Sequence, residues 1–408
     1  MKKSILNVLG PGLLFAGAAI GVSHLVQATR AGADYGLGLL WAIIVVHLFK
    51  YPFFRFGPQY ASATGESLLD GYKKLGKPYL ILYMVVNFIT MFTIQAAVTI
   101  VTAGLASQLF GITHNLVHWS YILLVVIIII LLFGKYSFLD KFIKYIILFL
   151  TISTLLAVSI AFFKNESSYS FQQILPKNAL EISFLIAFLG WMPAPLDISI
   201  WHSLWSVEKN KTTSEKITVK KSIFDFNVGY LGTLFLGICF ILLGTLVMFN
   251  TGETFSSSGG KFAIQLIDLY TKNLGSYSKI IIGIAAFTTM FSTTITTLDA
   301  SPRAMSKSTE LFGFKKLNYW FWILFLLIGT CIILTFFKSS MLTLVKIATI
   351  FSFLTAPIFA FLNFKLITSS HTPKEFQPNL FLKIVSILGF IFLLSFSLWY
   401  LNTFITAS

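Results

Sequence analysis

An apolar stretch of the sequence, from Leu180 to Leu204, is interrupted by Gly190-Trp191-Met192-Pro193-Ala194-Pro195-Leu196-Asp197. The stretch is long enough to cross the hydrocarbon core of a bilayer, which takes about 20 helical residues. Pro193 and Pro195 each lack an amide hydrogen, so the helix loses at least two hydrogen bonds within one turn. The segment therefore predicts a membrane helix that unwinds near its middle, with Gly190, Pro193 and Pro195 at the break.

A second interruption lies in the first apolar stretch, from Pro11 to Thr29. It contains Gly17 and then the sequence Gly21-Val22-Ser23-His24. Unpaired backbone at mid-membrane depth costs several kcal/mol per group unless protein or a water-filled cavity receives it. Glycine and proline also kink membrane helices for packing alone, and this interpretation stays open for each break taken singly. Because the breaks fall in the first and sixth stretches, the pair favours a transporter built from an inverted repeat, with its binding site between the breaks.

The composition places the rest of the chain in a membrane as well. Of 408 residues, 56% are hydrophobic and only 11% are charged, and the mean hydropathy is +0.83. Soluble domains carry about 25% charged residues, so a soluble enzyme and a disordered chain are both excluded. The basic residues lie in short clusters between apolar stretches, so the net charge of +15 indicates topology and not nucleic-acid binding. Cys239 and Cys331 lie within apolar stretches and predict neither a disulfide nor a metal site.

Eleven apolar stretches are predicted to span the bilayer. The predicted fold class is an all-α membrane protein of about 11 transmembrane helices, with a 5+5 inverted repeat and broken helices 1 and 6. Residues 1–163 form the first repeat, residues 164–370 the second, and residues 371–408 an appended eleventh helix. The predicted spans are Pro11–Thr29, Gly38–Phe56, Pro78–Leu105, Trp119–Phe133, Leu139–Phe162, Leu180–Leu204, Ile223–Phe249, Ser278–Ala300, Tyr319–Phe337, Leu342–Leu366 and Leu380–Phe404.

The distribution of basic residues predicts the orientation. Most of the 30 Lys and Arg residues fall in segments or span ends on one side, among them Lys2, Lys3 and Lys50. Cytoplasmic segments carry such an excess, so the N-terminus is predicted inside the cell and, with an odd number of spans, the C-terminus outside. With no transit peptide evident, the predicted location is a bacterial inner (plasma) membrane. The composition implies the lipid bilayer as a partner; it leaves the oligomeric state open, and a monomer is compatible with it.

Asp197 carries the most information about function. A carboxylate near the middle of the membrane costs about 2.5 to 3.5 kcal/mol even on the lenient insertion scale. The dipole of a half-helix that resumes at Ile198 returns only about 0.3 to 1 kcal/mol. The difference favours a cation or a proton as the partner of Asp197.

Other polar side chains within the spans are weaker candidates. His24 is a neutral ligand, a proton carrier or a hydrogen-bonded interior histidine, and Met192 is a soft metal ligand or a space-filling side chain. Gln95 shares one helix face with Thr99 and Thr102, as a polar stripe toward the interior or an interhelical hydrogen-bonding face would.

The eighth span is rich in hydroxyl groups. Thr293, Thr294 and Thr297 are oxygen ligands for a hard cation such as sodium, or else they bond back to their own helix. Asp299 with Arg303, and Arg30 with Asp34, are predicted ion pairs at i, i+4. The sequence has no nucleotide-binding signature and no HExxH motif, so a secondary transporter or a channel is predicted, and not an enzyme or an ATP-driven pump.

Two segments together resemble one family. The first is Gly10-Pro11-Gly12, which leads through the first break to Ala31-Gly32-Ala33-Asp34-Tyr35-Gly36-Leu37-Gly38-Leu39-Leu40-Trp41. The second is the sixth span, with Met192-Pro193 and His202-Ser203. Both are similar to the Nramp (natural resistance-associated macrophage protein) family of divalent metal ion transporters. The resemblance covers most of the chain. It implies the leucine-transporter fold, uptake of manganese, iron or related divalent ions, and proton coupling in typical members.

The chain departs from the family at the metal site. The family's Asp-Pro-Gly-Asn motif falls on Gly21-Val22-Ser23-His24, so the carboxylate of the first helix is absent. The family's Met-Pro-His motif has two registers. One matches Met192-Pro193 directly, and the other, anchored on His202-Ser203, puts Pro195 at the methionine and Asp197 at the histidine. A glutamine ligand of the tenth helix falls near Thr349, and the third span has no Asp or Glu for the family's proton path.

The leading hypothesis is a secondary active transporter that imports a divalent metal cation by alternating access, with manganese- or iron-like ions, or magnesium, as substrate and no cofactor. Coupling to protons is left open. Asp197 supplies the charge, Ser23, His24 and Gln95 are neutral ligands, and Met192 is an optional soft ligand. Backbone carbonyls around Gly17–Gly21 and Leu189–Trp191, with Thr349 nearby, complete the site. The alternatives are a sodium-coupled carrier of an amino-acid-like solute, with sodium at Thr293, Thr294 and Thr297, and a sensor that does not transport.

Overall fold

The computed structural model describes residues 10–133, 136–164, 170–212, 217–249, 251–275, 279–337 and 340–407, and every regular element in these ranges is a helix. Lys2 and Lys3, which the predicted orientation used, lie outside the described residues. The helices are α1 (Pro11–Ala19), η2 (Ser23–Ala28), α2 (Thr29–Tyr35), α3 (Leu40–Thr64), α4 (Leu68–Leu75), α5 (Lys77–Phe110), α6 (Leu116–Phe133), α7 (Tyr136–Lys164), α8 (Ala179–Trp191), α9 (Ile198–Thr212), α10 (Val219–Met248), α11 (Gly259–Leu274), α12 (Lys279–Leu311), α13 (Tyr319–Phe336), α14 (Met341–Ile367), η4 (Lys374–Phe376) and α15 (Leu380–Ala407).

The predicted spans correspond to these helices. In the described residues, eight single helices are long and apolar enough to cross a membrane, and α1 with η2 and α2 forms a ninth, bent span. The two other predicted spans are α7 and the pair α8 and α9. The all-helical, multi-pass architecture is therefore confirmed, whereas the repeat boundaries at residues 163 and 370 stay a prediction.

Both predicted breaks are present. The first span bends by 45° between Ala19 and Ser23, and then continues as the π-helix η2, a form that is rare and often found at functional sites. The sixth span leaves the helix after Trp191 and resumes at Ile198. Two positions need correction, because Gly17 and Gly190 lie inside α1 and α8, in the last turn before each break. At Gly190 the missing side chain instead allows a close approach, because a Cβ there would lie 2.1 Å from the carbonyl oxygen of Thr349.

Close packing at glycine fixes α1 against α10. A Cβ on Gly12 would lie 2.0 Å from the carbonyl oxygen of Asp225, and one on Gly229 would lie 2.0 Å from the carbonyl oxygen of Gly12. The carboxylate of Asp225 also accepts hydrogen bonds from the amides of Gly10 (3.0 Å) and Gly12 (2.8 Å). These amides are among those that a helix N-terminus leaves without an intrahelical partner, so Asp225 caps α1.

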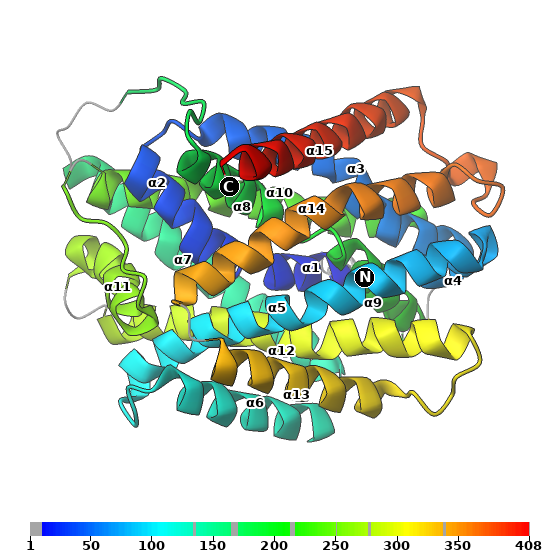
Figure 1. Cartoon of the computed structure of the whole chain (residues 1–408), viewed down its shortest axis with the longest axis horizontal. Coiled ribbons are helices and arrows are strands. Elements are labelled where there is room, and N and C mark those ends of the chain that lie inside the picture. The colour runs from blue at the N-terminus through cyan, green and yellow to red at the C-terminus, as the bar shows by residue number, and fades with distance from the viewer. Residues whose placement is uncertain are drawn as a thin grey trace, which may run out of the picture.

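The broken spans lie at the centre of the bundle. Figure 1 shows α1 between α14 on one side and α5 and α12 on the other, with α15 along one edge and α6 and α13 along the opposite edge. Only 28% of the most apolar stretch of α6, α13 and α15 is buried, against 61% in α5 and 67% in α12. The outer helices therefore present apolar side chains to lipid, and α5 and α12 enclose the breaks.

Candidate transport site

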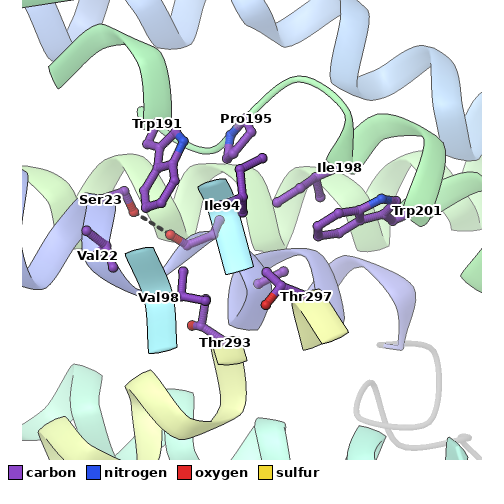
Figure 2. Close-up of a pocket in the computed structure, with 12 residues that line it drawn as sticks. Val22, Ser23, Ile94, Val98, Trp191, Pro195, Ile198, Trp201, Thr293 and Thr297 are labelled. Atoms are coloured by element: carbon purple, nitrogen blue, oxygen red, sulfur yellow. Dashed lines mark hydrogen bonds between the residues drawn. The ribbon is translucent and has the colours of Figure 1, made fainter. Parts of the chain in front are cut away.

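A small cavity lies between the two breaks. It offers about 20 Å³ to the centre of a water molecule, which is enough for about one water. Figure 2 shows Trp191 and Pro195 on one side and Thr293 and Thr297 on the other, with Trp201 closing one end. The walls come from the first span, α5, the sixth span and α12: Ala18, Ala19, Val22, Ser23, Ile94, Val98, Trp191, Pro195, Ile198, Trp201, Thr293 and Thr297.

The lining is mostly apolar. Its side-chain oxygens are the hydroxyls of Ser23, Thr293 and Thr297. In the described residues, no three His, Cys, Asp or Glu side chains lie close enough together to hold a metal ion. In the residues that the structure describes, the cavity therefore presents hydroxyl and backbone oxygens to an ion, and it lacks a cluster of charged ligands.

Asp197 lies at the restart of the sixth span, two residues after Pro195 and directly before Ile198. Its side chain is 2% exposed, and its Oδ1 has no hydrogen-bond partner. Asp197 directly precedes the first residue of α9, so the positive end of that helix dipole favours its charge, as the dipole interpretation expects. The unpartnered Oδ1 leaves the carboxylate with capacity for a further proton or cation.

Lys50 is the residue that sequence reasoning places wrongly. Its position in the sequence puts it among the cytoplasmic span ends, yet its side chain is fully buried in α3. Its Nζ donates hydrogen bonds to the carbonyls of Leu189 (2.8 Å), Gly190 (2.8 Å) and Ala194 (3.3 Å). The broken sixth span leaves these carbonyls without helical partners, and a buried ammonium needs such acceptors. Lys50 therefore contributes no information on orientation.

His24 and Ser23 serve mainly to position the first break. The Nε2 of His24 lies 2.9 Å from the carbonyl oxygen of Thr233 on α10, and its Nδ1 lies 2.7 Å from Ser23 Oγ. A carbonyl only accepts, so Nε2 carries a proton toward Thr233. Ser23 Oγ also bonds to the carbonyl of Ala19 across the break, as the dashed line in Figure 2 shows. The histidine therefore faces α10, whereas Ser23 lines the cavity.

The polar stripe of α5 faces α12. Gln95 Oε1 accepts a hydrogen bond of 2.6 Å from Thr297, and its Nε2 donates to Thr99 (3.2 Å) and to the carbonyl of Thr294 (3.4 Å). Thr102 shares a hydrogen bond of 2.7 Å with Thr294. The stripe therefore forms interhelical hydrogen bonds, and Gln95 as an ion ligand stays a prediction that requires these bonds to break.

The three threonines of the predicted sodium site separate into two groups. Thr293 and Thr297 line the cavity, and Thr293 Oγ1 lies 3.3 Å from the carbonyl oxygen of Gly17. Thr294 turns away from the cavity toward α5. Two hydroxyls and one first-span carbonyl are therefore close to one another.

The remaining predicted site residues support the walls. Trp191 lines the cavity, and its Nε1 donates a 2.8 Å hydrogen bond to Ser352 on α14. Met192 is buried beside it but is not part of the lining, whereas Pro195 is. The hydroxyl of Thr349 bonds back to its own helix, at carbonyls of Val345 and Lys346.

Gly21 lies directly against α12. A Cβ at this position would come within 2.6 Å of Thr293 Oγ1. The absence of a side chain therefore allows the first break to contact the eighth span.

Charged recesses lie at the two ends of the bundle. Arg30, Asp34, Glu181 and Lys346 line one of them, at the ends of α2, α8 and α14. The other, at the ends of α3, α9 and α12, contains Glu66, Asp70, Glu208, Arg303 and Lys307. Both predicted ion pairs are present, at 3.7 Å for Arg30 and Asp34 and at 2.6 Å for Arg303 and Asp299.

Comparison with known proteins gives the same fold. The chain is 37% identical over 403 residues to an uncharacterised protein of Pasteurella multocida (strain Pm70), covering 96% of this chain and 91% of that protein. A manganese transporter of Eremococcus coleocola, in complex with an aromatic bis-isothiourea substituted compound, has a TM-score of 0.74 at 15% identity, covering 97% of this chain and 86% of that one. MhsT in complex with L-phenylalanine has a TM-score of 0.68 at 15% identity, covering 98% of both chains.

These likenesses establish the leucine-transporter fold with its two broken helices. The model of the family described as natural resistance-associated macrophage protein-like matches residues 12–403, which is nearly the whole chain. The resemblance seen in the sequence is thereby confirmed, and the chain belongs to the Nramp family.

Proposed function

We propose that the protein is a secondary active transporter that imports a divalent metal cation, manganese- or iron-like, by alternating access between its broken helices. Asp197 is not part of the cavity lining, but it lies in the chain between the lining residues Pro195 and Ile198. In this proposal the cavity and Asp197 together form the centre of the substrate site. In this proposal the N-terminus is cytoplasmic, the C-terminus lies outside, and the membrane is the inner membrane of a bacterium. The recesses at the two ends of the bundle are the outer and inner approaches to the site.

The size of the cavity carries the proposal. About 20 Å³ of space for water centres admits a small ion, whereas pockets for organic ligands measure about 300 to 1,000 Å³. Asp197 adds a buried carboxylate with a free oxygen at the same break. A hard cation prefers oxygen ligands, which the hydroxyls, the carboxylate and the unwound backbone provide.

The ligand set predicts loose binding. Among the residues that the structure describes, Asp197 is the single carboxylate at the break, and the nearby Lys50 acts on it through space. A divalent ion therefore gains less from this site than from one with two acidic ligands, and it retains more of its hydration water. We expect weak affinity and poor discrimination among divalent ions of similar size.

The test is uptake of manganese into proteoliposomes by wild-type protein and by Asp197→Asn. The variant keeps the shape of the side chain but removes the charge, so uptake should fall at least about tenfold, the equivalent of about 1.4 kcal/mol. Asp268→Asn is the matched control, because Asp268 is a half-buried carboxylate on α11, away from both breaks. Full uptake by Asp197→Asn, at equal reconstitution, refutes the assignment.

A second candidate is a sodium-coupled carrier of an organic solute. The approach of Thr293 to the carbonyl of Gly17, beside Thr297, supports it, because two hydroxyls and a carbonyl suit a sodium ion. Trp191 and Trp201 provide aromatic walls for a solute, provided that the cavity widens when the site opens. Uptake of a labelled amino acid that requires external sodium and that manganese does not inhibit favours this candidate over the first.

A further inference from the structure

The end of α8 leaves carbonyl oxygens that need a positive partner. The last four carbonyls of a helix have no intrahelical donor, and the helix dipole places partial negative charge at the same end. In α8 these groups include the carbonyls of Leu189 and Gly190, and the carbonyl of Ala194 from the unwound segment turns toward the same point. Three oxygens thus converge deep in the bundle, at the break of a membrane helix.

Lys50 occupies the point where the three oxygens converge. An ammonium has three N–H donors and no acceptor, and each donor here has one carbonyl acceptor. A neutral amine has only two N–H groups and would leave one of the three carbonyls without a donor, whereas the charged form serves all three. The side chain reaches this point from α3, and no part of it is exposed to solvent.

The contacts resemble those of a bound monovalent ion and not those of an ion pair. All three hydrogen bonds of Lys50 go to backbone carbonyls, while Asp197, with its Oδ1 unpartnered, acts on the ammonium through space. Carbonyl oxygens at unwound helix ends are the groups with which broken-helix transporters bind monovalent cations. The covalent link to α3 gives this cation an effective concentration that a free ion does not reach.

We propose that the carbonyls of Leu189, Gly190 and Ala194 form a monovalent-cation site that the chain fills with its own Lys50. The transport cycle then needs no free sodium or potassium ion at the sixth break. This inference does not depend on which substrate is carried, because it concerns only the occupant of the carbonyl site.

The test removes the tethered cation and offers a free one. In Lys50→Ala the carbonyls lose their partner and the site opens, so the apparent melting temperature of the purified protein should fall. Methylammonium, which reproduces the end of the lysine side chain, should then raise it in a saturable manner, by about 2 °C or more at ten times its Kd. Sodium and potassium are tested in parallel, and choline, which is too large for the site, controls for ionic strength.

Two further variants make the result specific. His47→Ala removes a buried side chain one turn away on α3 but leaves Lys50 in place, so it should lose stability without responding to methylammonium. Lys50→Met fills the same space without charge and should not respond either. Should the alanine variant not fold, Lys50→Ser provides the same test, because its hydroxyl holds water in the vacated space.

The expected pattern is recovery by small cations in the alanine or serine variant alone. Equal responses to methylammonium and choline, or no response to any small cation in a folded variant, overturn the proposal. The measurement uses stability and not uptake, so a failure of the proposed metal transport leaves this result interpretable.

Discussion

The close contact between Gly21 and Thr293 predicts how tightly the first break packs against the eighth span. An ideal Cβ on Gly21 lies 2.6 Å from Thr293 Oγ1 and 3.0 Å from its Cγ2, whereas ordinary contact begins near 3.4 Å. Gly21→Ala therefore requires a shift of about 0.8 Å, and Thr293 Oγ1 is fixed by bonds to the carbonyls of Gly17 (3.3 Å) and Thr289 (3.2 Å). Overpacking of this kind costs about 1 to 3 kcal/mol.

Thr293→Ala removes the two nearest atoms and leaves only the Cβ, at 3.2 Å from the new methyl group. Gly21→Ala should therefore cost at least about 1 kcal/mol less in the Thr293→Ala background than in the wild type. The assay is the apparent free energy of unfolding in detergent for both single variants and the double variant. Gly232→Ala, whose Cβ meets nothing within 4 Å, serves as the control and should show the same effect in both backgrounds. Equal costs of Gly21→Ala in the two backgrounds refute the reasoning.

Three further substitutions test other contacts of the breaks. Asp225→Asn should destabilise by about 2 to 3 kcal/mol, because the α1 cap loses its charge-assisted bonds; thermal melting measures the loss, and an unchanged midpoint contradicts the cap. Gly190→Ala places a Cβ 2.1 Å from the backbone oxygen of Thr349, and no side-chain rotamer relieves this clash. We therefore expect the free energy of unfolding to fall by at least about 3 kcal/mol. Size-exclusion chromatography should show a low yield of monodisperse protein. Trp191→Phe removes one hydrogen bond to Ser352 and should cost about 1 kcal/mol in the same melting assay; a loss above about 3 kcal/mol would mean that the indole has a larger role than this bond.

The breaks themselves were predictable from the sequence because their cause is local. Pro193 and Pro195 cannot donate the hydrogen bonds of a helix wherever the rest of the chain lies. The ion pairs at i, i+4 were predictable for the same reason, since helix geometry alone brings the partners together. The resemblance to the Nramp family then predicted the rest of the fold.

The partners of the buried polar groups were not predictable, because they lie far apart in the chain. His24 bonds to a carbonyl of Thr233, and Lys50 to carbonyls more than a hundred residues away. Lys50 was also misleading in a specific way. The positive-inside rule counts a lysine near a span end as a surface residue, whereas its long side chain here extends into the bundle. Only the close approach of α3 to the sixth break makes this possible.

The same geometry explains how the sixth break stays stable. Each unpaired carbonyl in the bundle centre costs free energy unless a donor or an ion meets it. Lys50 meets three at once, and the amide of Ile198 bonds to the carbonyl of Pro195 within the unwound segment. The sixth break is therefore stable without a bound substrate. A transporter that changes conformation with an empty site needs this stability. In the proposed transport cycle a substrate ion is bound by what remains, namely the free oxygen of Asp197 and the hydroxyls of the cavity, and we expect this small set to limit the affinity.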